Sequence, residues 1–329
     1  MQLSIIFVNY QSEDLLLNCF RSIYQYTQGL EFECIVVDNK YQAGANAAIL
    51  QEFPATTWID LGYNAGFSKA NNAGLAVAKA PHVLFMNADT LVTDNAIGKA
   101  YEYLQEKPEI AAVGAIQIDA EGNPIPYYRT LNDIRIDLYI LPNIPAWKRF
   151  VYQCFPSYVA QASYETNNLV GFFLMTSQKV IAQVGAWDED FFMYAEDAEW
   201  CTRLIQAGKL AYFEDIRVRH LLGDNPFRRA KTSWVNRFSV QIQVSNLLWI
   251  RKSYGLGAYL LILLNYAALV PLFWTWKILL NLIKMRPLMH NTENQVLFSR
   301  KTGMLFHYFW QTVFLLKKSY QIKPEENVQ

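Results

Sequence analysis

A dense group of carboxylates in residues 185–204, GAWDEDFFMYAEDAEWCTRL, is the first feature of this sequence that could do chemistry. Its six acidic residues are interleaved with aromatic side chains, which the solvated face of a surface helix would not carry. Apolar walls raise the pKa of a carboxylate and make it a better proton acceptor. Asp197, with Glu196 beside it, is therefore our candidate general base, because aromatics precede it at the expected start of a helix. Capping of that helix is the alternative role for Asp197.

A second candidate site follows the apolar run in HVLFMNADT, residues 82–90. The run is typical of a buried strand, yet it stops at Asn87 and Asp89 follows almost at once. A lone Asp at a strand end is usually a turn former or a helix cap, but it can also bind a cation. His220 ends another strand-like stretch, LAYFEDIRVRH (210–220), and is either a metal ligand or a buried structural histidine.

The elements that must position these residues alternate between apolar strand-type runs and helix-type stretches over the first 120 residues. This pattern predicts an α/β fold, with strands at 4–10, 33–39, 57–61, 82–87 and 111–118. Helices are expected from Ser12 as N-cap, at 67–79 and at 94–107. Ligands of such sheets bind outside the carboxyl ends of the strands. The candidate binding residues are therefore Asn9, Tyr10, Asp38, Asn39, Asn64, Gly66, Asn87 and Asp89.

After residue 120 the alternation of strand-type and helix-type stretches is less regular. Residues 123–163 are rich in Pro, Tyr and Trp and show no clean period, which indicates an insertion or long loop. Strands are expected again at 167–176 and 210–220, and helices at 177–184 and 197–207.

Glycine-rich phosphate cradles of the common kinds are missing. There is no G-x-x-x-x-G-K-[ST], and no G-x-G-x-x-G follows the first strand, so P-loop and dinucleotide-binding functions lose their main support. The stretch GYNAGFSKANNAGLAVA (62–78) offers glycines, asparagines and Lys69, which could line a nucleotide pocket in another way.

Composition excludes several other classes. The 29 basic and 29 acidic residues balance, so no global field would attract nucleic acid. The four cysteines are scattered without the spacing of a zinc or redox motif, and we expect reduced thiols. The chain starts with strand-like LSIIFVNY and lacks the features of a signal peptide, so we expect the first half to be cytosolic.

The C-terminal part is apolar enough to contact a membrane. No charged residue occurs in 253–276, which is long enough to cross the hydrocarbon core, and a second uncharged run, 302–316, would suit an interfacial helix. Basic residues flank both runs, and Pro271 could kink the first into a re-entrant shape. A helical hairpin buried in a soluble domain is the alternative.

Taken together, the motifs resemble those of family 2 glycosyltransferases of the rhamnosyltransferase-like branch. The matching pieces are SIIFVNYQSEDLLLNCFRSI, CIVVDN, NAGFSKANNAG, VLFMNADT, NNLVGFFLM and GAWDEDFFMYAEDAEWCTRL, in the family's order, over about residues 3–222. The resemblance implies a GT-A (Rossmann-like) mixed sheet flanked by helices. It also implies an inverting enzyme that moves a sugar from a nucleotide-diphosphate donor to a hydroxyl of a glycan or polyprenyl-linked acceptor, in surface polysaccharide or glycan biosynthesis.

The resemblance also assigns roles to residues. Asp38 would bind the nucleotide base with Asn9 and Tyr10 beside it, Asp89 and His220 would hold Mg²⁺ or Mn²⁺ and through it the diphosphate, and Asp197 of the ED motif would be the base. We expect the acceptor near Trp187, Asp188 and Glu189.

Two departures from the family's patterns matter. Asn87 replaces the first carboxylate of the D-x-D motif, so metal binding could require the donor. The Q-x-x-R-W motif of processive synthases is missing, which favours the addition of one sugar per encounter.

We expect a catalytic domain at 1–230, with a nucleotide-sugar half (1–120) and an acceptor half (121–230). A membrane-associated helical region (231–322) and a polar tail (323–329) would follow. The enzyme would then work at the cytoplasmic face of the inner membrane, with the lipid membrane as a partner and no nucleic acid. A sugar nucleotidyltransferase is one alternative, although NYQSED lacks the Gly-rich, basic loop that it needs. A degenerate membrane-bound scaffold without activity is the other.

Overall fold

The computed structural model describes residues 1–40, 42–125, 130–140, 158–221, 234–316 and 319–323, with residues 146, 149–150 and 153. The chain forms two compact units, each described here by itself. The sheet unit consists of Met1–Leu131, Tyr158–Phe192 and Glu196–Arg228. The helical unit consists of Asn132–Ser157, Met193–Ala195 and Arg229–Gln329, so residues 132–140 of the expected insertion group with the C-terminal helices.

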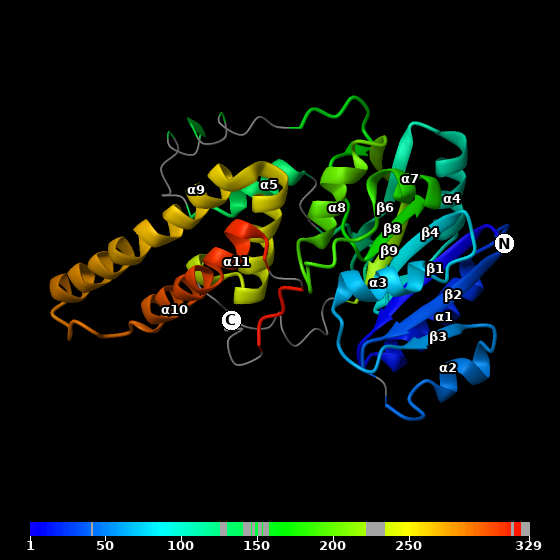
Figure 1. The fold of residues 1–329 in the computed structure, drawn as a ribbon, viewed down its shortest axis with the longest axis horizontal. Coiled ribbons are helices and arrows are strands. Elements are labelled where there is room, and N and C mark those ends of the chain that lie inside the picture. Colours follow the sequence, from blue (N-terminus) through cyan, green and yellow to red (C-terminus); the bar gives the residue numbers. More distant parts are fainter. Residues whose placement is uncertain are drawn as a thin grey trace. The chain divides into compact units, whose positions relative to one another are not determined.

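One mixed sheet organises the sheet unit, in the order β3-β2-β1-β4-β8-β6-β9-β5, with β7 beside β9 (Figure 1). The first four neighbours, β3 to β4, are parallel, as is the pair β6–β9, whereas β5, β7 and β8 pair antiparallel. The strands are β1 (Leu3–Asn9), β2 (Phe32–Asp38), β3 (Thr57–Asp60), β4 (His82–Asn87), β5 (Thr90–Val92), β6 (Ile110–Ile118), β7 (Glu165–Thr166), β8 (Phe173–Ser177) and β9 (Lys209–His220).

Helices cover the sheet through apolar faces with helical spacing. In α1 (Glu13–Tyr26) the buried side chains are Leu16, Cys19, Phe20 and Ile23. Helix α3 (Phe67–Leu75) packs against β1 and β2, and it can approach closely because a Cβ at Gly74 would lie 2.6 Å from Ile6. The other helices are α2 (Ala47–Glu52), α4 (Ala96–Glu106), α7 (Gln178–Val184) and α8 (Glu196–Leu204).

The expected strands and helices of the first 120 residues are confirmed, with shifts at their ends. The strand expected at 167–176 is shorter, because only Phe173–Ser177 is extended. The residues before it form a loop whose N–H groups bind side chains: Leu169 N donates to Cys201 Sγ (3.1 Å), and Val170 N donates to the Tyr212 hydroxyl (3.0 Å). The short elements α2 and β5 were not expected, since six and three residues are too few for a period to show.

The helical unit contains α9 (Val240–Ile283), α10 (Glu293–His307) and α11 (Phe309–Phe314), preceded by α5 (Leu131–Asp137) and a 3₁₀ turn at Trp234–Asn236. Helix α9 leaves helical geometry at Gly255 (φ 86°, ψ 177°) and continues through Pro271. The break lies at the glycine because this backbone conformation is open only to residues without a Cβ. The helix expected at 302–316 begins earlier, at Glu293, and is split at Tyr308.

Candidate donor and catalytic site

Four polar residues lie at one edge of the sheet because they end neighbouring parallel strands. Asn9 pairs with Asp38 and Asp38 pairs with Asp60, so these three share one face of the sheet, whereas Asn87 lies opposite Val8 and so on the other face. The carboxyl ends of β1 to β4, where open sheets bind ligands, therefore carry Asn9, Asp38, Asp60 and Asn87.

Asn9 and Asp38 form a buried network at this edge. Asn9 is fully buried and Asp38 is 1% exposed. Asn9 Nδ2 donates to Asp38 Oδ1 (3.2 Å) and to Glu13 Oε1 (3.0 Å), and the backbone N–H of Lys40 also donates to Asp38 Oδ1 (3.0 Å). Burial raises the pKa of Asp38 above its ordinary value. Both side chains thus fix the loop after β2.

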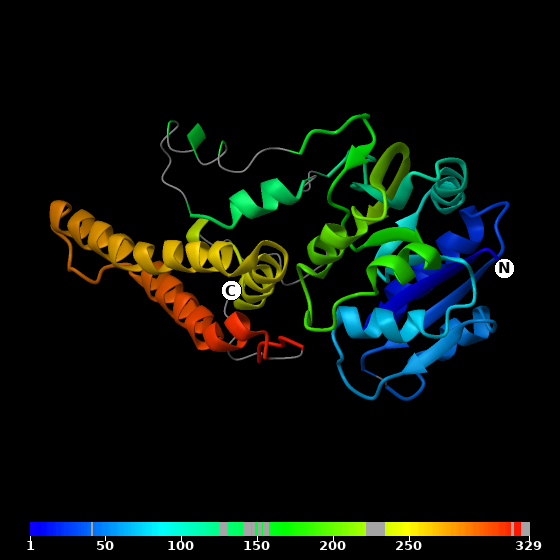
Figure 2. The same cartoon turned by 45° about the horizontal axis from the view of Figure 1, so that its top comes forward.

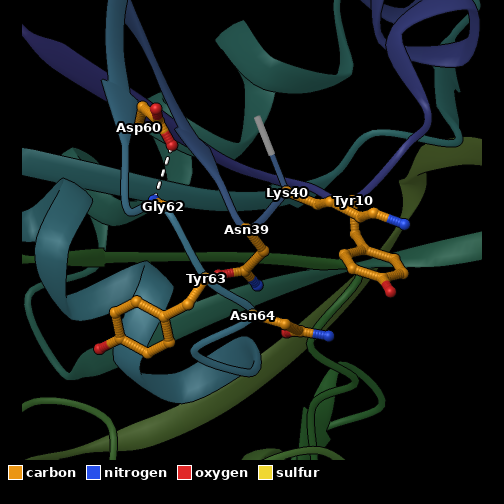
Figure 3. A pocket seen from close by; sticks show the side chains of 7 residues that line it. All are labelled: Tyr10, Asn39, Lys40, Asp60, Gly62, Tyr63 and Asn64. Atoms are coloured by element: carbon orange, nitrogen blue, oxygen red, sulfur yellow. Dashed lines mark hydrogen bonds between the residues drawn. The ribbon is translucent and has the colours of Figure 1, made fainter. Parts of the chain in front are cut away.

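An open hollow of about 460 Å³ lies beside this network (Figure 3). Three of its lining residues were expected: Tyr10, Asn39 and Asn64. The tyrosine rings of Tyr10 and Tyr63 are about half exposed and can stack on a planar base. Gly62 also lines it and belongs to the stretch expected to line a nucleotide pocket, whereas Lys40, Asp60 and Tyr63 were not singled out.

The missed residues share a readable signal, because they lie at or just after the ends of the strands predicted at 33–39 and 57–61. Asp60 Oδ1 accepts a hydrogen bond from Gly62 N (2.7 Å), which fixes the carboxylate at the rim of the hollow (Figure 3).

Asparagine side chains hold the loop between β3 and α3. Asn39 Nδ2 donates to Gly66 O (3.1 Å), and Gly66 N donates to Asn64 Oδ1 (3.1 Å). Lys69 lies one turn into α3 with its ammonium 5.3 Å from the centre of the Tyr63 ring. The expected residues of this loop are therefore brought together with the hollow.

Asp89 and His220 meet because β5 pairs with β9, which places Thr90 opposite His220. His220 Nε2 lies 3.0 Å from Asp89 Oδ1 and 3.5 Å from Asn87 Nδ2. The ring of Phe172 stacks on the imidazole at 4.9 Å between centroids, which fixes its orientation.

This pair fits a divalent cation that shares its coordination with a ligand. The described residues contain no cluster of three or more His, Cys, Asp or Glu side chains that could hold a metal by themselves. One carboxylate and one imidazole leave most coordination positions of Mg²⁺ or Mn²⁺ to other oxygens, such as those of a diphosphate.

Asp197 lies in the first turn of α8 and is tied to the Asn87–Asp89 loop through the main chain. Its Oδ2 accepts from Gly171 N (3.2 Å) and its Oδ1 accepts from Ala198 N (2.8 Å). The next residue after Gly171 is Phe172, whose carbonyl accepts from Asn87 N (3.0 Å). Burial raises the pKa of Asp197 above its ordinary value, and the two backbone N–H groups oppose this shift.

Glu196 is a second buried acid beside Asp197. Burial and the neighbouring Asp197 raise the pKa of Glu196 to about 8. Its Oε2 is buried and has no hydrogen-bond partner among the residues that the structure describes. The third acid of this turn, Glu199, forms an ion pair with Arg203 (2.7 Å).

The three residues expected near an acceptor have different environments. Trp187 is 2% exposed, and its ring packs against Phe67, Phe85 and Trp200. It therefore supports its loop and leaves no ring face open. Glu189 is exposed and Asp188 is partly exposed, so a ligand can reach both.

Asn72, which belongs to the stretch expected to line a nucleotide pocket, clamps this loop. Its Nδ2 donates to Trp187 O (2.9 Å) and Glu189 Oε1 (3.0 Å), and its Oδ1 accepts from Trp187 N (3.1 Å).

Solved structures with the same fold include two transferases. The mannosyltransferase PcManGT from Pyrobaculum calidifontis, in complex with GDP-Man and Mn²⁺, is 15% identical, with a TM-score of 0.50 over 92% of this chain and 86% of that chain. GalNAc-T7 with UDP, GalNAc and Mn²⁺ is 15% identical, with a TM-score of 0.55 over 76% of this chain and 48% of that one. The predicted GT-A fold is thus confirmed.

Curated relatives are more similar in sequence. The low-salt glycan biosynthesis hexosyltransferase Agl10 of Haloferax volcanii is 26% identical over 61% of this chain, and the dTDP-rhamnosyl transferase RfbF of Shigella flexneri is 28% identical over 58%. The N-acetylglucosaminyl-diphospho-decaprenol L-rhamnosyltransferase of Mycobacterium tuberculosis is 25% identical over 54%.

These matches span 61%, 60% and 62% of the relatives' own lengths. The sequence profile of "Glycosyl transferase family 2" matches residues 4–182, more than half of the chain and most of the sheet edge described above. The chain therefore belongs to glycosyl transferase family 2.

Proposed function

We propose that the chain transfers one sugar per encounter from a nucleotide-diphosphate donor to a hydroxyl of a glycan or lipid-linked acceptor, with inversion. The observation that carries this proposal is the main-chain link from Asp197 through Gly171 and Phe172 to Asn87. This link joins the buried carboxylate of Asp197 to the Asn87–Asp89 loop, which would bind the diphosphate through a cation. A proton acceptor and a leaving-group site are then held by one short segment.

The donor would lie along the edge of the sheet. Its base fits the hollow beside Tyr10 and Tyr63, where the carboxylate of Asp60 can accept a hydrogen bond from a base N–H. Asp89 and His220 would hold Mg²⁺ or Mn²⁺, which when bound offsets the negative charge that develops on the leaving nucleotide. Structures of fold neighbours that contain Mn²⁺ with GDP-Man or UDP support this reading.

The base in this scheme is Asp197. It takes the proton of the acceptor hydroxyl as the hydroxyl oxygen bonds to the anomeric carbon and the bond from that carbon to the diphosphate oxygen breaks. Such proton transfer contributes about 100- to 10,000-fold to the rate. Asp197 is assigned this role rather than Glu196 because its Oδ2 accepts from Gly171 N, next to the Phe172–Asn87 link.

A polyprenyl-linked acceptor would place the enzyme at the cytoplasmic face of the inner membrane. The name of the Mycobacterium tuberculosis relative contains a diphospho-decaprenol acceptor, which supports this class. The apolar helix α9 is also long and apolar enough to contact the membrane that holds such a lipid.

The test is Asp197→Asn, with Asp190→Asn as control for the same chemical change within the acidic cluster. Nucleotide sugars are first screened for turnover, and the active donor is then used with each variant. We expect Asp197→Asn to bind donor normally by calorimetry and to lose at least about 100-fold in kcat, while Asp190→Asn stays within a few-fold. Retention of more than about a tenth of kcat would refute the assignment. Formation of a nucleotide sugar from a sugar phosphate would indicate a nucleotidyltransferase, and binding without any turnover would indicate a scaffold.

A further inference from the structure

The helical unit folds back on itself as a hairpin. After Gly255, α9 runs outward to Ile283, and α10 and α11 return beside it (Figures 1 and 2). The contacts follow an antiparallel order. Asn281 Nδ2 donates to Leu288 O (2.7 Å) at the turn, Trp274 Nε1 donates to Ser299 Oγ (2.9 Å), and Arg251 donates to Val313 O (2.8 Å). The outgoing and returning chains therefore end on the same side of the hairpin.

One face of α9 is left uncovered, and it is apolar. We call this face the apolar stripe: Leu261, Leu264, Leu272, Trp276, Leu279 and Ile283, each between 47% and 77% exposed. Their spacing of three, four or eight residues places them on one side of a helix. The opposite side carries the buried Ile262, Leu263 and Tyr266. The apolar stripe stays exposed although α9 already packs against α10 and α11.

The charges along α9 and at its turn are basic, and the exposed Glu293 of α10 is the first acidic residue after them. From residue 231 to 292 the sequence contains seven Lys or Arg residues and no Asp or Glu. Lys284 and Arg286 are exposed at the turn, beside Met285, which is 95% exposed. Two copies of such a surface would repel each other, whereas an anionic lipid surface would attract it.

A crossing of the bilayer does not fit the hairpin. A single crossing would separate the two ends that the antiparallel contacts hold together. A double crossing would require the returning helices α10 and α11 to span the membrane, although the helix is interrupted between them at Tyr308. It would also bring the exposed Arg300 of α10 into lipid.

We propose that the hairpin is a monotopic anchor whose apolar stripe lies in the interface of an anionic bilayer, with the turn and both ends on the same side. This inference specifies the membrane partner of the proposed function, but it concerns binding and needs no substrate. The stripe supplies apolar contact, and the turn supplies cations near lipid phosphates.

The first test measures binding of the full chain to sedimented vesicles of phosphatidylcholine with about 30% phosphatidylglycerol. The variant Leu264→Glu/Trp276→Glu changes two exposed positions of the stripe. The control Val77→Glu adds the same kind of charge at a 41% exposed position of the sheet unit. We expect the wild type and the control to bind, and the stripe variant to bind at least about tenfold more weakly. Equal binding of the stripe variant, or a lipid-independent dimer that this variant dissociates, would overturn the proposal.

The second test locates the turn. Met285→Cys is made in a chain with Cys154→Ser, since the other cysteines, Cys19, Cys34 and Cys201, are buried. A membrane-impermeant maleimide is added outside vesicles to which the protein has bound. We expect the introduced thiol to be labelled as fast in intact vesicles as in vesicles opened with detergent. Labelling only after detergent is added would show that the hairpin crosses the bilayer. Donor hydrolysis by the same samples reports on catalysis separately, so either proposal can fail alone.

Discussion

Replacement of Gly66 by alanine tests whether the loop between β3 and α3 is held in place by its contact with the loop before α8. A Cβ at Gly66 would lie 2.3 Å from the carbonyl oxygen of Phe192, far inside contact distance. The same carbonyl accepts a hydrogen bond from Phe67 N (2.7 Å). The backbone at Gly66 (φ 82°, ψ −176°) is a conformation that alanine adopts only with strain.

The expected cost has three parts. Backbone strain contributes about 1–3 kcal/mol, displacement of the Phe192 peptide about 1–3 kcal/mol, and loss of the Phe67–Phe192 hydrogen bond about 0.5–1.5 kcal/mol. We therefore expect Gly66→Ala to lower the free energy of unfolding by roughly 3–7 kcal/mol. Gly62→Ala is the matched control, because Gly62 also has a positive φ (70°) but nothing lies within 4 Å of its added Cβ. It should cost only about 1–2 kcal/mol.

Urea denaturation with circular dichroism gives the two free energies, and hydrogen exchange of peptides from 62–75 and 187–195 gives the local response. Only Gly66→Ala should speed exchange in both peptides, since it alone breaks the contact between them. If the two variants unfold at the same urea concentration and exchange alike, the Gly66–Phe192 contact does not lock these loops.

Three further outcomes are expected. Asp89→Ala should weaken calorimetric binding of the donor in Mn²⁺ at least about tenfold and remove its metal dependence; unchanged affinity would make Asp89 a turn residue. The pKa of Glu196 is raised to about 8 in the folded chain from an ordinary 4.5. Its protonation therefore stabilises the fold fully below about pH 4.5, and this contribution is lost as pH rises through about 8. Urea midpoints should fall over this range in the wild type, and Glu196→Gln should flatten the profile. Asn72→Ala should cost about 1–3 kcal/mol and raise KM for acceptor more than for donor, because it frees the loop of Trp187; equal changes in both KM values would contradict this.

Much of the fold was predictable because the signals are local. Strands β1, β2 and β4 are apolar runs bounded by polar loops, and a parallel sheet buries such runs on both faces. The end of each strand could therefore be found, and with it Tyr10, Asn39 and Asn64 of the hollow. Gly255 was passed over because a glycine within an apolar helical run carries no local sign that the helix will break there.

The site was predicted less completely where the backbone makes the contacts. Asp197 and Asp89 are recognisable by residue type and position, but the link between them passes through Gly171 N and the carbonyl of Phe172, which any sequence could supply. Trp187 was expected near an acceptor, and its ring fills the space between Phe85 and Trp200.

These main-chain contacts have a consequence for how the site works. Gly66 belongs to the loop that borders the hollow, and Phe192 belongs to the acidic loop that leads to Asp197, 126 positions later in the sequence. The carbonyl of Phe192 accepts a hydrogen bond from the N-terminus of α3, and Asn72 on the same helix holds Trp187 at the other end of that loop. Helix α3 therefore contacts both the loop beside the hollow and the acidic loop. If the proposed mechanism holds, a change on α3 that leaves every acidic residue in place should still uncouple donor binding from transfer, because the helix connects the two loops.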